Sequence, residues 1–221
     1  MSVIGAPTEW TDLIDTLVPQ ILTLVIATWE GLSAPASDAR EDDVTIALCR
    51  ALRQNRTARA LPFQVYTQQV ELDPVPGEDM GRLDITFLPC IPREDIYFCL
   101  ECKRLNVVKG DKRPAYASQY VRFGMLRFIT GQYAKAVRHG GMVAYVLDGN
   151  VPRAIANVGA NIRAQYSALC MTAPGAFLRS TVLKHDNRAR ETHHHRAHET
   201  NLFCIHHLFM PRNCPEPGQA A

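Results

Sequence analysis

Asp84, Glu101 and Lys103 are charged side chains within two neighbouring apolar segments, 82–88 and 95–103. Two carboxylates placed together repel each other, and a hard divalent cation such as Mg²⁺ relieves that repulsion by taking oxygen ligands. Such a cation also neutralises charge that builds on a phosphate, while a neighbouring lysine can orient the attacking water. Hydrolysis of a phosphodiester bond needs this set of groups.

Both segments are predicted to be β-strands, and their residue pattern decides which side chains can meet. Side chains alternate between the two faces of a strand, so Glu101 and Lys103 share one face while Cys102 points to the other. A short connection joins the segments and predicts antiparallel pairing. That pairing would bring Asp84 to the two charges at one end of the sheet. The alternative is that Glu101 and Lys103 form an ordinary surface salt bridge, which contributes little to stability.

Sixteen residues separate Asp84 from the Glu101-Cys102-Lys103 motif, and this arrangement resembles the PD-(D/E)xK nuclease superfamily. In that family the aspartate lies on one strand of a hairpin and the E-x-K motif on the next. The residues here read GRLD in place of the proline-aspartate pair. The resemblance implies an α/β fold of the restriction-endonuclease-like type, with a central mixed β-sheet flanked by helices.

The resemblance also implies a metal-dependent nuclease and roles for the motif residues. Asp84 and Glu101 would bind Mg²⁺, which Mn²⁺ can replace, and Lys103 would position or activate the attacking water. The main-chain carbonyl of Cys102 would be a further metal ligand, as the intervening residue is in the family. The implied substrate is DNA, in defence against foreign DNA or in repair. The implied partners besides DNA are a second copy of the chain or a larger defence or repair complex.

Glu41 is the candidate for a third acid, because the family core begins with a helix that often supplies one. The segment 38–56 has the apolar spacing of a helix and fits that place. At 100° per residue, Glu41 lies about 20° from Leu48 and Leu52 on the apolar stripe. We therefore expect it to face the sheet and to be a catalytic acid and metal ligand. The alternative is structural, since Asp38 and Glu41 have the spacing of a capping box.

The segment 114–138 reads as one long helix, or as two short helices broken near Gly124 or Gly131, followed by a buried strand. Four side chains on it are candidates for contacts with DNA: Arg122, Arg127, Gln132 and Lys135. Some family members carry a glutamine and a tyrosine near the site, which adds two pairs: Gln119–Tyr120 and Gln132–Tyr133. A solvated face explains the basic residues equally well, and a packed core explains the aromatic ones.

The chain of 221 residues, with 47% hydrophobic residues, is long enough to bury one good core. We predict a single nuclease-like domain over residues 1–210. It would comprise an N-terminal helical extension (1–36), the core motif region (38–148), and a C-terminal helix, loop and strand (149–210). A proline- and glycine-rich tail, 211–221, is expected to be disordered.

Charge, cysteine content and hydropathy indicate which partners and which cellular compartment suit the protein. The net charge of +2 is too small to indicate nucleic-acid binding by itself, so any basic surface must be local. The seven cysteines are scattered without C-x-x-C spacing, which favours reduced thiols in the cytoplasm. Asp15, Pro19 and Gln20 interrupt the apolar stretch 13–29, which therefore predicts a buried or amphipathic helix and no membrane span.

Histidines gather in the polar, basic segment 184–200, which is expected to be a solvated loop. His194 and His198 have the i, i+4 spacing of zinc ligands on a helix, but no C-x-x-C pair accompanies them. The closing strand would turn His206 or His207 toward the core or the site, most simply as a structural histidine.

Two other functions fit the same pattern. One is a nucleic-acid-binding module that keeps the nuclease fold without cutting, although the intact acids and lysine argue against it. The other is a protein-interaction domain whose apolar N-terminal helix docks a partner. Cleavage of DNA that requires a metal would separate the nuclease from both.

Overall fold

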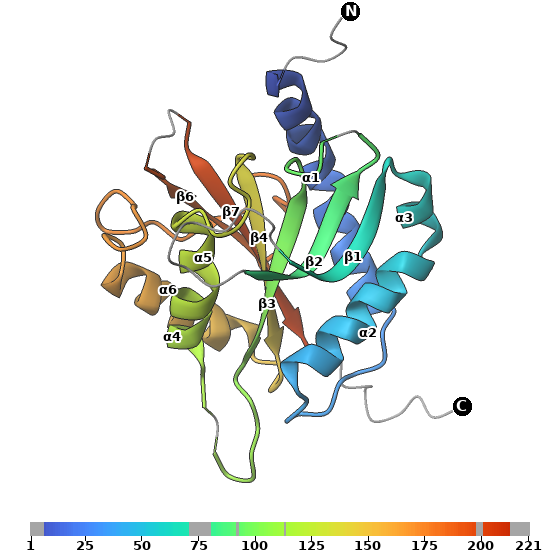
Figure 1. The fold of residues 1–221 in the computed structure, drawn as a ribbon. Helices are drawn as coiled ribbons and strands as arrows, with labels where there is room; N and C mark the ends of the chain where they lie inside the picture. The colour runs from blue at the N-terminus through green and yellow to red at the C-terminus, as the bar shows by residue number, and fades with distance from the viewer. Residues whose placement is uncertain (1–6, 71–80, 92, 113, 198–200, 213–221) are drawn as a thin grey trace, which may run out of the picture.

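A computed structural model describes residues 7–70, 81–91, 93–112, 114–197 and 201–212 of the chain. This part is built around a seven-stranded mixed sheet with helices on both faces (Figure 1). The prediction of an α/β fold with a central mixed sheet flanked by helices is confirmed.

The strands and helices follow one another in a simple order along the chain. The strands are β1 (Phe63–Val70), β2 (Arg82–Pro89), β3 (Phe98–Leu105), β4 (His139–Val146), β5 (Leu178–Arg179), β6 (Ala189–His194) and β7 (Phe203–Pro211). The helices are α1 (Pro7–Glu30), α2 (Glu41–Gln54), α3 (Arg56–Ala60), α4 (Ala117–Tyr120), a π-helical turn η1 (Val121–Met125), α5 (Leu126–Ile129) and α6 (Val151–Ala164).

The strand order in the sheet is β1-β2-β3-β4-β7-β6-β5. The first three strands pair antiparallel, β3 pairs parallel with β4, β4 pairs parallel with β7, and the remaining pairs are antiparallel. The E-x-K motif lies in the middle of β3, whereas the sequence placed it near the strand end. The reason is the parallel pairing with β4, which continues from Leu100 to Leu105 and extends β3 past the motif.

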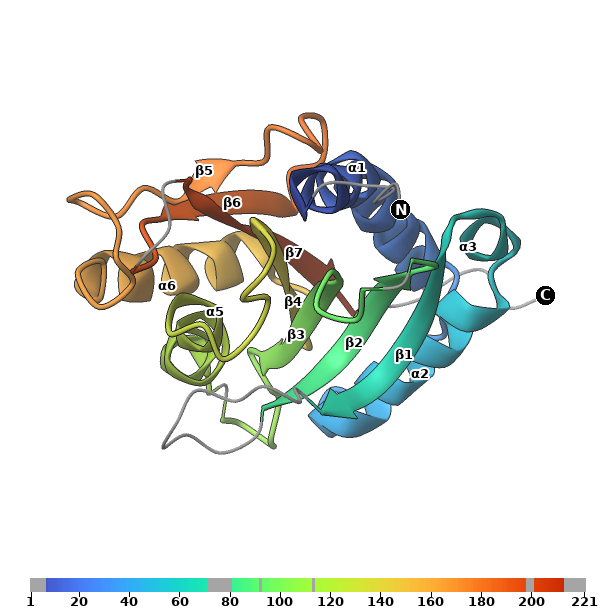
Figure 2. The same ribbon diagram turned by 45° about the horizontal axis from the view of Figure 1, so that its top comes forward.

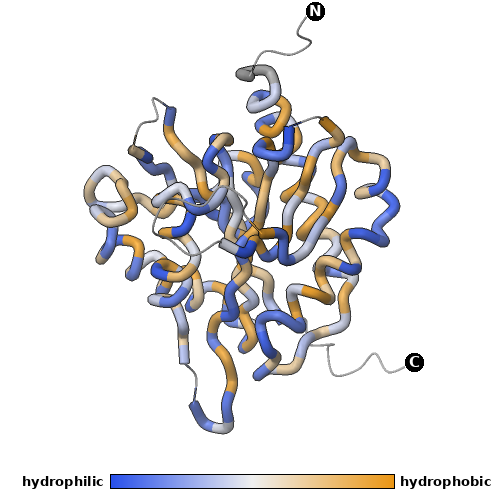
Figure 3. Tube along the Cα trace, in the orientation of Figure 1, coloured by the Kyte–Doolittle hydropathy of each residue, from blue (hydrophilic) through white to orange (hydrophobic). Residues whose placement is uncertain are grey.

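Helices α1 and α2 cover one face of the sheet, while α4, α5 and α6 cover the other (Figure 2). β4 and β7, in the middle of the sheet, are buried along almost their whole length. Strands buried on both faces have nearly continuous hydrophobic sequences. Figure 3 shows hydrophobic residues along the central strands and hydrophilic ones along α3.

Helix α1 belongs to the same core as the sheet, although the segment 1–36 was predicted to be an extension. Ile14 and Leu22 are fully buried. The indole of Trp29 stacks on Tyr145 of β4 with ring centroids 5.3 Å apart, and its Nε1 donates a hydrogen bond to the carbonyl oxygen of Pro211 at 2.9 Å. The helix is therefore held by both central strands.

By length and composition alone, residues Trp10–Glu30 could cross a membrane, and half of the most apolar 18-residue window in this stretch is buried inside the protein. A helix that forms part of a protein core satisfies the same criterion, so the stretch is weak evidence for a membrane span.

The connection between β3 and β4 is only partly helical, and the predicted helix over 114–138 ends at Ile129. The π-helical turn brings Gly124 close to the sheet. A Cβ atom at this position would lie 2.4 Å from Cε of Met142 and 3.7 Å from Cγ of Glu101. A side chain at this position would displace the end of Met142, so glycine lets the helix pack directly over β3 and β4, and π-helical turns often lie at functional sites.

The prediction of a solvated loop over 184–200 is wrong, because β6 lies within it and pairs with β7. The strand is polar but its buried groups have partners. Oγ1 of Thr192 lies 2.7 Å from Nε2 of His194, and Nδ1 of His194 lies 2.7 Å from the carbonyl oxygen of Leu169. Buried polar groups are tolerated where they are hydrogen-bonded. Burial lowers the pKa of His194 to about 4, so this histidine is neutral.

Two predictions fall outside the described residues. One is the role of His198. The other is the tail 211–221, of which only the first two residues are described, and Pro211 is the last residue of β7.

Candidate functional site

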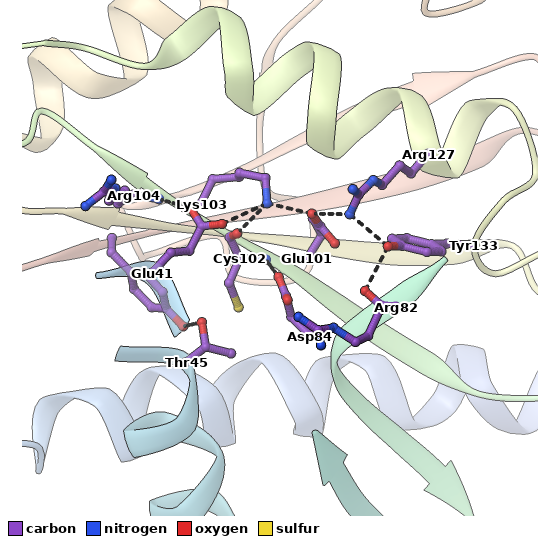
Figure 4. Close-up of polar contacts among 11 residues, drawn as sticks. Glu41, Thr45, Arg82, Asp84, Glu101, Cys102, Lys103, Arg104, Arg127 and Tyr133 are labelled. Atoms are coloured by element: carbon purple, nitrogen blue, oxygen red, sulfur yellow. Dashed lines mark hydrogen bonds and ion pairs between the residues drawn. The ribbon is translucent and has the colours of Figure 1, made fainter. Parts of the chain in front are cut away.

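Asp84 and Glu101 lie where β2 and β3 separate. The main-chain ladder between these strands ends at the pair Ile85–Leu100, and one further step of the register would place Asp84 opposite Glu101 on the same face. At that point Oδ2 of Asp84 accepts a hydrogen bond of 2.7 Å from the main-chain N–H of Cys102 (Figure 4). The carboxylate thus takes the place of a main-chain carbonyl and is held against β3.

The ammonium of Lys103 lies among oxygen atoms of three residues. Its Nζ is 2.6 Å from Oε1 of Glu101, 3.0 Å from Oε1 of Glu41, and 3.0 Å from the carbonyl oxygen of Cys102 (Figure 4). Because Oε1 of Glu101 and Oε1 of Glu41 contact the same nitrogen, the distance between these two oxygens cannot exceed the sum of their distances to it. The structure thus places all the predicted catalytic residues, together with the Cys102 carbonyl, around the point where β2 and β3 diverge.

Glu41 reaches the site from the first position of α2. Its second oxygen accepts a hydrogen bond of 2.9 Å from the main-chain N–H of Arg104, so the carboxylate spans two positions of β3. Arg40 is the residue that caps the helix, and its side chain makes no capping bond. The capping-box alternative, with Asp38 as the cap, is therefore wrong: Glu41 bonds to the strand and not to its own helix end.

Arg127 and Tyr133 approach Glu101 from the opposite side (Figure 4). Nη1 of Arg127 is 2.9 Å from Oε1 of Glu101 and donates to the hydroxyl of Tyr133 at 2.8 Å. That hydroxyl donates in turn to the carbonyl oxygen of Arg82 at 2.9 Å. The chain links the acid on β3 to the start of β2 and fixes the carboxylate from a second direction.

The other predicted DNA contacts lie on the same segment as Arg127 but are placed differently. Arg122 and Lys135 are exposed, and Gln132 is half-buried. Tyr120, from the predicted Gln119–Tyr120 pair, is fully buried. It contacts the far strand β7, so it takes no part in the cluster of acids.

A pocket of ≈ 310 Å³ opens beside the cluster, lined by Glu41, Lys103, Arg104, Tyr116, Gln119 and Phe123. Phe123 is 59% exposed, and the guanidinium of Arg104 lies 5.7 Å from the ring centroid of Tyr116. Sequence reasoning named Gln119 but missed the two aromatic residues and Arg104. The sequence did contain one indication of Phe123: it is an aromatic residue next to the basic Arg122, at a position where the predicted helix would face solvent.

Burial dominates the electrostatics of the cluster. It raises the pKa of Glu101 to about 7, with help from the charge of Asp84 and against the opposing effects of Lys103 and Arg127. Burial also raises the pKa of Asp84. Burial alone would lower the pKa of Lys103, but Glu101, Glu41 and Asp84 outweigh it and raise that pKa. At neutral pH the lysine is charged, and burial makes Glu101 easier to protonate than an exposed glutamate.

The oxygen atoms of the site fit a hard divalent cation. Oε2 of Glu101 is buried, and within the described part of the chain it has no hydrogen-bond partner. A buried carboxylate oxygen without a partner loses its hydration and gains nothing in return. The neighbouring oxygen atoms belong to carboxylates and a main-chain carbonyl, which are the kinds of ligand that Mg²⁺ takes.

We expect the affinity for Mg²⁺ to depend on pH through Glu101. A proton and the cation compete for this carboxylate, so the measured dissociation constant should rise about tenfold for each pH unit below the pKa of about 7 and level off above it. Titration calorimetry with Mg²⁺ or Mn²⁺ measures this dissociation constant. A range from about pH 5.5 to about pH 8.5 extends about 1.5 units to either side of the pKa of Glu101. Glu101→Gln should bind more weakly and without the pH step. Equal wild-type affinity at both ends of the range would contradict the assignment.

A scan against models of known protein families, a search of curated proteins and a search of solved structures each found no match to this chain.

Proposed function

We propose that the chain is a metal-dependent nuclease that hydrolyses phosphodiester bonds in DNA. The observation that carries the proposal is the position of Lys103, whose ammonium lies between the carboxylates of Glu41 and Glu101 where β2 and β3 separate. The order of elements supports a restriction-endonuclease-like core, because a helix precedes an antiparallel strand pair and a helical crossover then leads to a parallel strand.

Asp84, Glu101 and the carbonyl oxygen of Cys102 would hold Mg²⁺, with Glu41 beside them. When bound, the ion would neutralise charge on the phosphate and make water more acidic. Lys103 would donate a hydrogen bond to the attacking water and hold it in line, while its charge stabilises the transition state. Arg127 is a positioning residue that keeps Glu101 in place.

The pocket beside the cluster supports a nucleic-acid substrate. The exposed ring of Phe123 and the ring of Tyr116 offer flat surfaces on which a base can stack. Arg104 and Lys103 add positive charge at the same place, which suits a phosphate. The surroundings of the acids therefore combine the two kinds of contact that a nuclease needs.

Two further observations bear on the environment and on the rival functions. The cysteines in the described part of the chain are all free thiols, which supports a reducing compartment such as the cytoplasm. The apolar residues of α1 pack in the chain's own core, which argues against this helix as a docking element for another protein.

Incubation of plasmid and single-stranded DNA with the wild-type chain tests the proposal. We expect cleavage with Mg²⁺ or Mn²⁺ and none after addition of EDTA, as measured by gel electrophoresis. Electrophoretic mobility shift on the same DNA provides the second readout. DNA that is bound but left intact under every metal condition would favour the binding module, and DNA that is neither bound nor cut would exclude both functions.

A further inference from the structure

His139, Cys204 and His206 form a second cluster of chemically active groups. His139 pairs with Cys204 between β4 and β7, and His206 lies two residues further along the same face. Each of the three offers one ligand atom, and these atoms all lie within 4.8 Å of one another. Glu101 pairs with Met142, whose side chain points away from the His139 face, so the two clusters lie on opposite faces of the sheet.

The two imidazoles are already placed as neighbouring ligands would be. Nδ1 of His139 and Nε2 of His206 are 3.1 Å apart. Two nitrogens bound to a tetrahedral zinc ion at the usual distance would be about 3.3 Å apart. The other nitrogen of His139, Nε2, lies 3.3 Å from Oδ1 of Asp15 on α1, and Arg138 forms an ion pair with the same carboxylate. A carboxylate behind a ligating histidine is the usual orienting partner in zinc sites.

His206 has fewer hydrogen-bond partners than the other two histidines that lie buried in β6 and β7. Both ring nitrogens of His194 have partners, and so do both of His207, which lie 2.9 Å from the hydroxyls of Tyr120 and Thr192. Nδ1 of His206, by contrast, is buried and has no hydrogen-bond partner among the residues that the structure describes. Hydrogen bonds therefore hold the ring of His206 less firmly than those of His194 and His207, and its Nε2 faces Nδ1 of His139 in the cluster.

We propose that His139, Cys204 and His206 bind one zinc-class divalent transition-metal ion, with Asp15 orienting His139 and solvent completing the coordination. Imidazole and thiolate are ligands that select zinc-like ions, whereas the carboxylate cluster around Glu101 suits Mg²⁺. The ion would join β4 to β7 and, through Asp15, to α1. Its binding displaces the proton of the Cys204 thiol to solvent and does not depend on the proposed nuclease activity.

Titration of the metal-stripped full chain with Co²⁺, followed by absorbance, tests this proposal. We expect one equivalent to bind with a thiolate-to-cobalt charge-transfer band, Zn²⁺ to displace it, and Mg²⁺ to leave it unchanged. Cys204→Ser should abolish the charge-transfer band. Asp15→Asn should weaken binding by roughly tenfold or more, as loss of an orienting carboxylate does in other zinc sites.

Stability provides a second readout that does not need the thiolate. Free Zn²⁺ at a hundredfold excess over the dissociation constant should raise the Tm of a chain this size by about 5–10 °C. The side chain of His139 is 23% exposed, so His139→Gln should fold without difficulty and lose this shift. Circular dichroism of each variant checks that it has folded.

Two matched variants distinguish this site from metal binding by exposed residues. Cys90→Ser and His195→Ala alter exposed side chains and should keep the charge-transfer band and the Tm shift. The proposal is overturned if the wild-type chain binds no stoichiometric Co²⁺, if Cys204→Ser keeps the band, or if His195→Ala removes the binding that His139→Gln leaves intact.

Discussion

Lys103→Met is expected to lower the rate of DNA cleavage by roughly a thousandfold, because it removes the charge and the hydrogen bond that the proposed mechanism directs at the attacking water. Methionine keeps much of the length of the side chain, so the core around Cys102 should be little disturbed. The ammonium also shares the oxygens of Glu41 and Glu101 with any incoming cation. Its removal should therefore leave Mg²⁺ affinity unchanged or raise it. Single-turnover cleavage and calorimetric Mg²⁺ titration measure the two effects separately.

Two matched variants show whether the effect belongs to the site. Asp84→Asn should lose both cleavage and Mg²⁺ affinity, because it removes a ligand charge while it keeps an oxygen near the N–H of Cys102. Lys184→Met changes an exposed lysine in the connection between β5 and β6 and should cleave at the wild-type rate. A Lys103→Met chain that cuts as fast as the wild type would remove the lysine from the mechanism.

The parts of the candidate site that sequence could predict are those set by local geometry. The alternation along a strand and a short connection suffice to bring Asp84 near Glu101, because neighbouring antiparallel strands have a register that continues from residue to residue. The helical period likewise suffices to turn Glu41 toward the sheet, since Leu48 and Leu52 on the same stripe must be buried.

The parts that sequence could not predict depend on contacts between distant segments. The polar composition of 184–200 predicted a loop where β6 lies. The sequence pattern does not show that the buried side chains of Thr192 and His194 are hydrogen-bonded within the core. His194 and His198 have the spacing of zinc ligands on a helix, although their segment was expected to be a solvated loop, and His194 in fact lies in β6. The histidine cluster in the fold instead joins His139 to Cys204, which only the parallel pairing of β4 with β7 brings together.

Arg196→Met is expected to lower the free energy of unfolding by about 3 kcal/mol, since buried carbonyl groups would lose charged donors. Arg196 is 5% exposed, and its guanidinium donates to the carbonyl oxygens of Ala134 at 3.0 Å and of Val137 at 2.8 Å. It also lies 3.9 Å from the ring centroid of Phe203, a contact that methionine keeps only in part. Urea unfolding at equilibrium measures the loss.

The same substitution should also slow cleavage, because the segment that Arg196 holds carries Tyr133 next to Arg127. Looser placement of this pair would leave Glu101 less firmly oriented, and misplacement of catalytic groups lowers rates on the order of tenfold to a hundredfold. Arg190→Met is the matched control, because the guanidinium of Arg190 donates to the carbonyl oxygens of Asn187 and Ala189, which are close to it in the chain. This substitution should change stability by less than about 1 kcal/mol. If Arg196→Met unfolds at the wild-type urea concentration, the irregular segment before β4 is held by its hydrophobic contacts alone, and any loss of cleavage must have another cause.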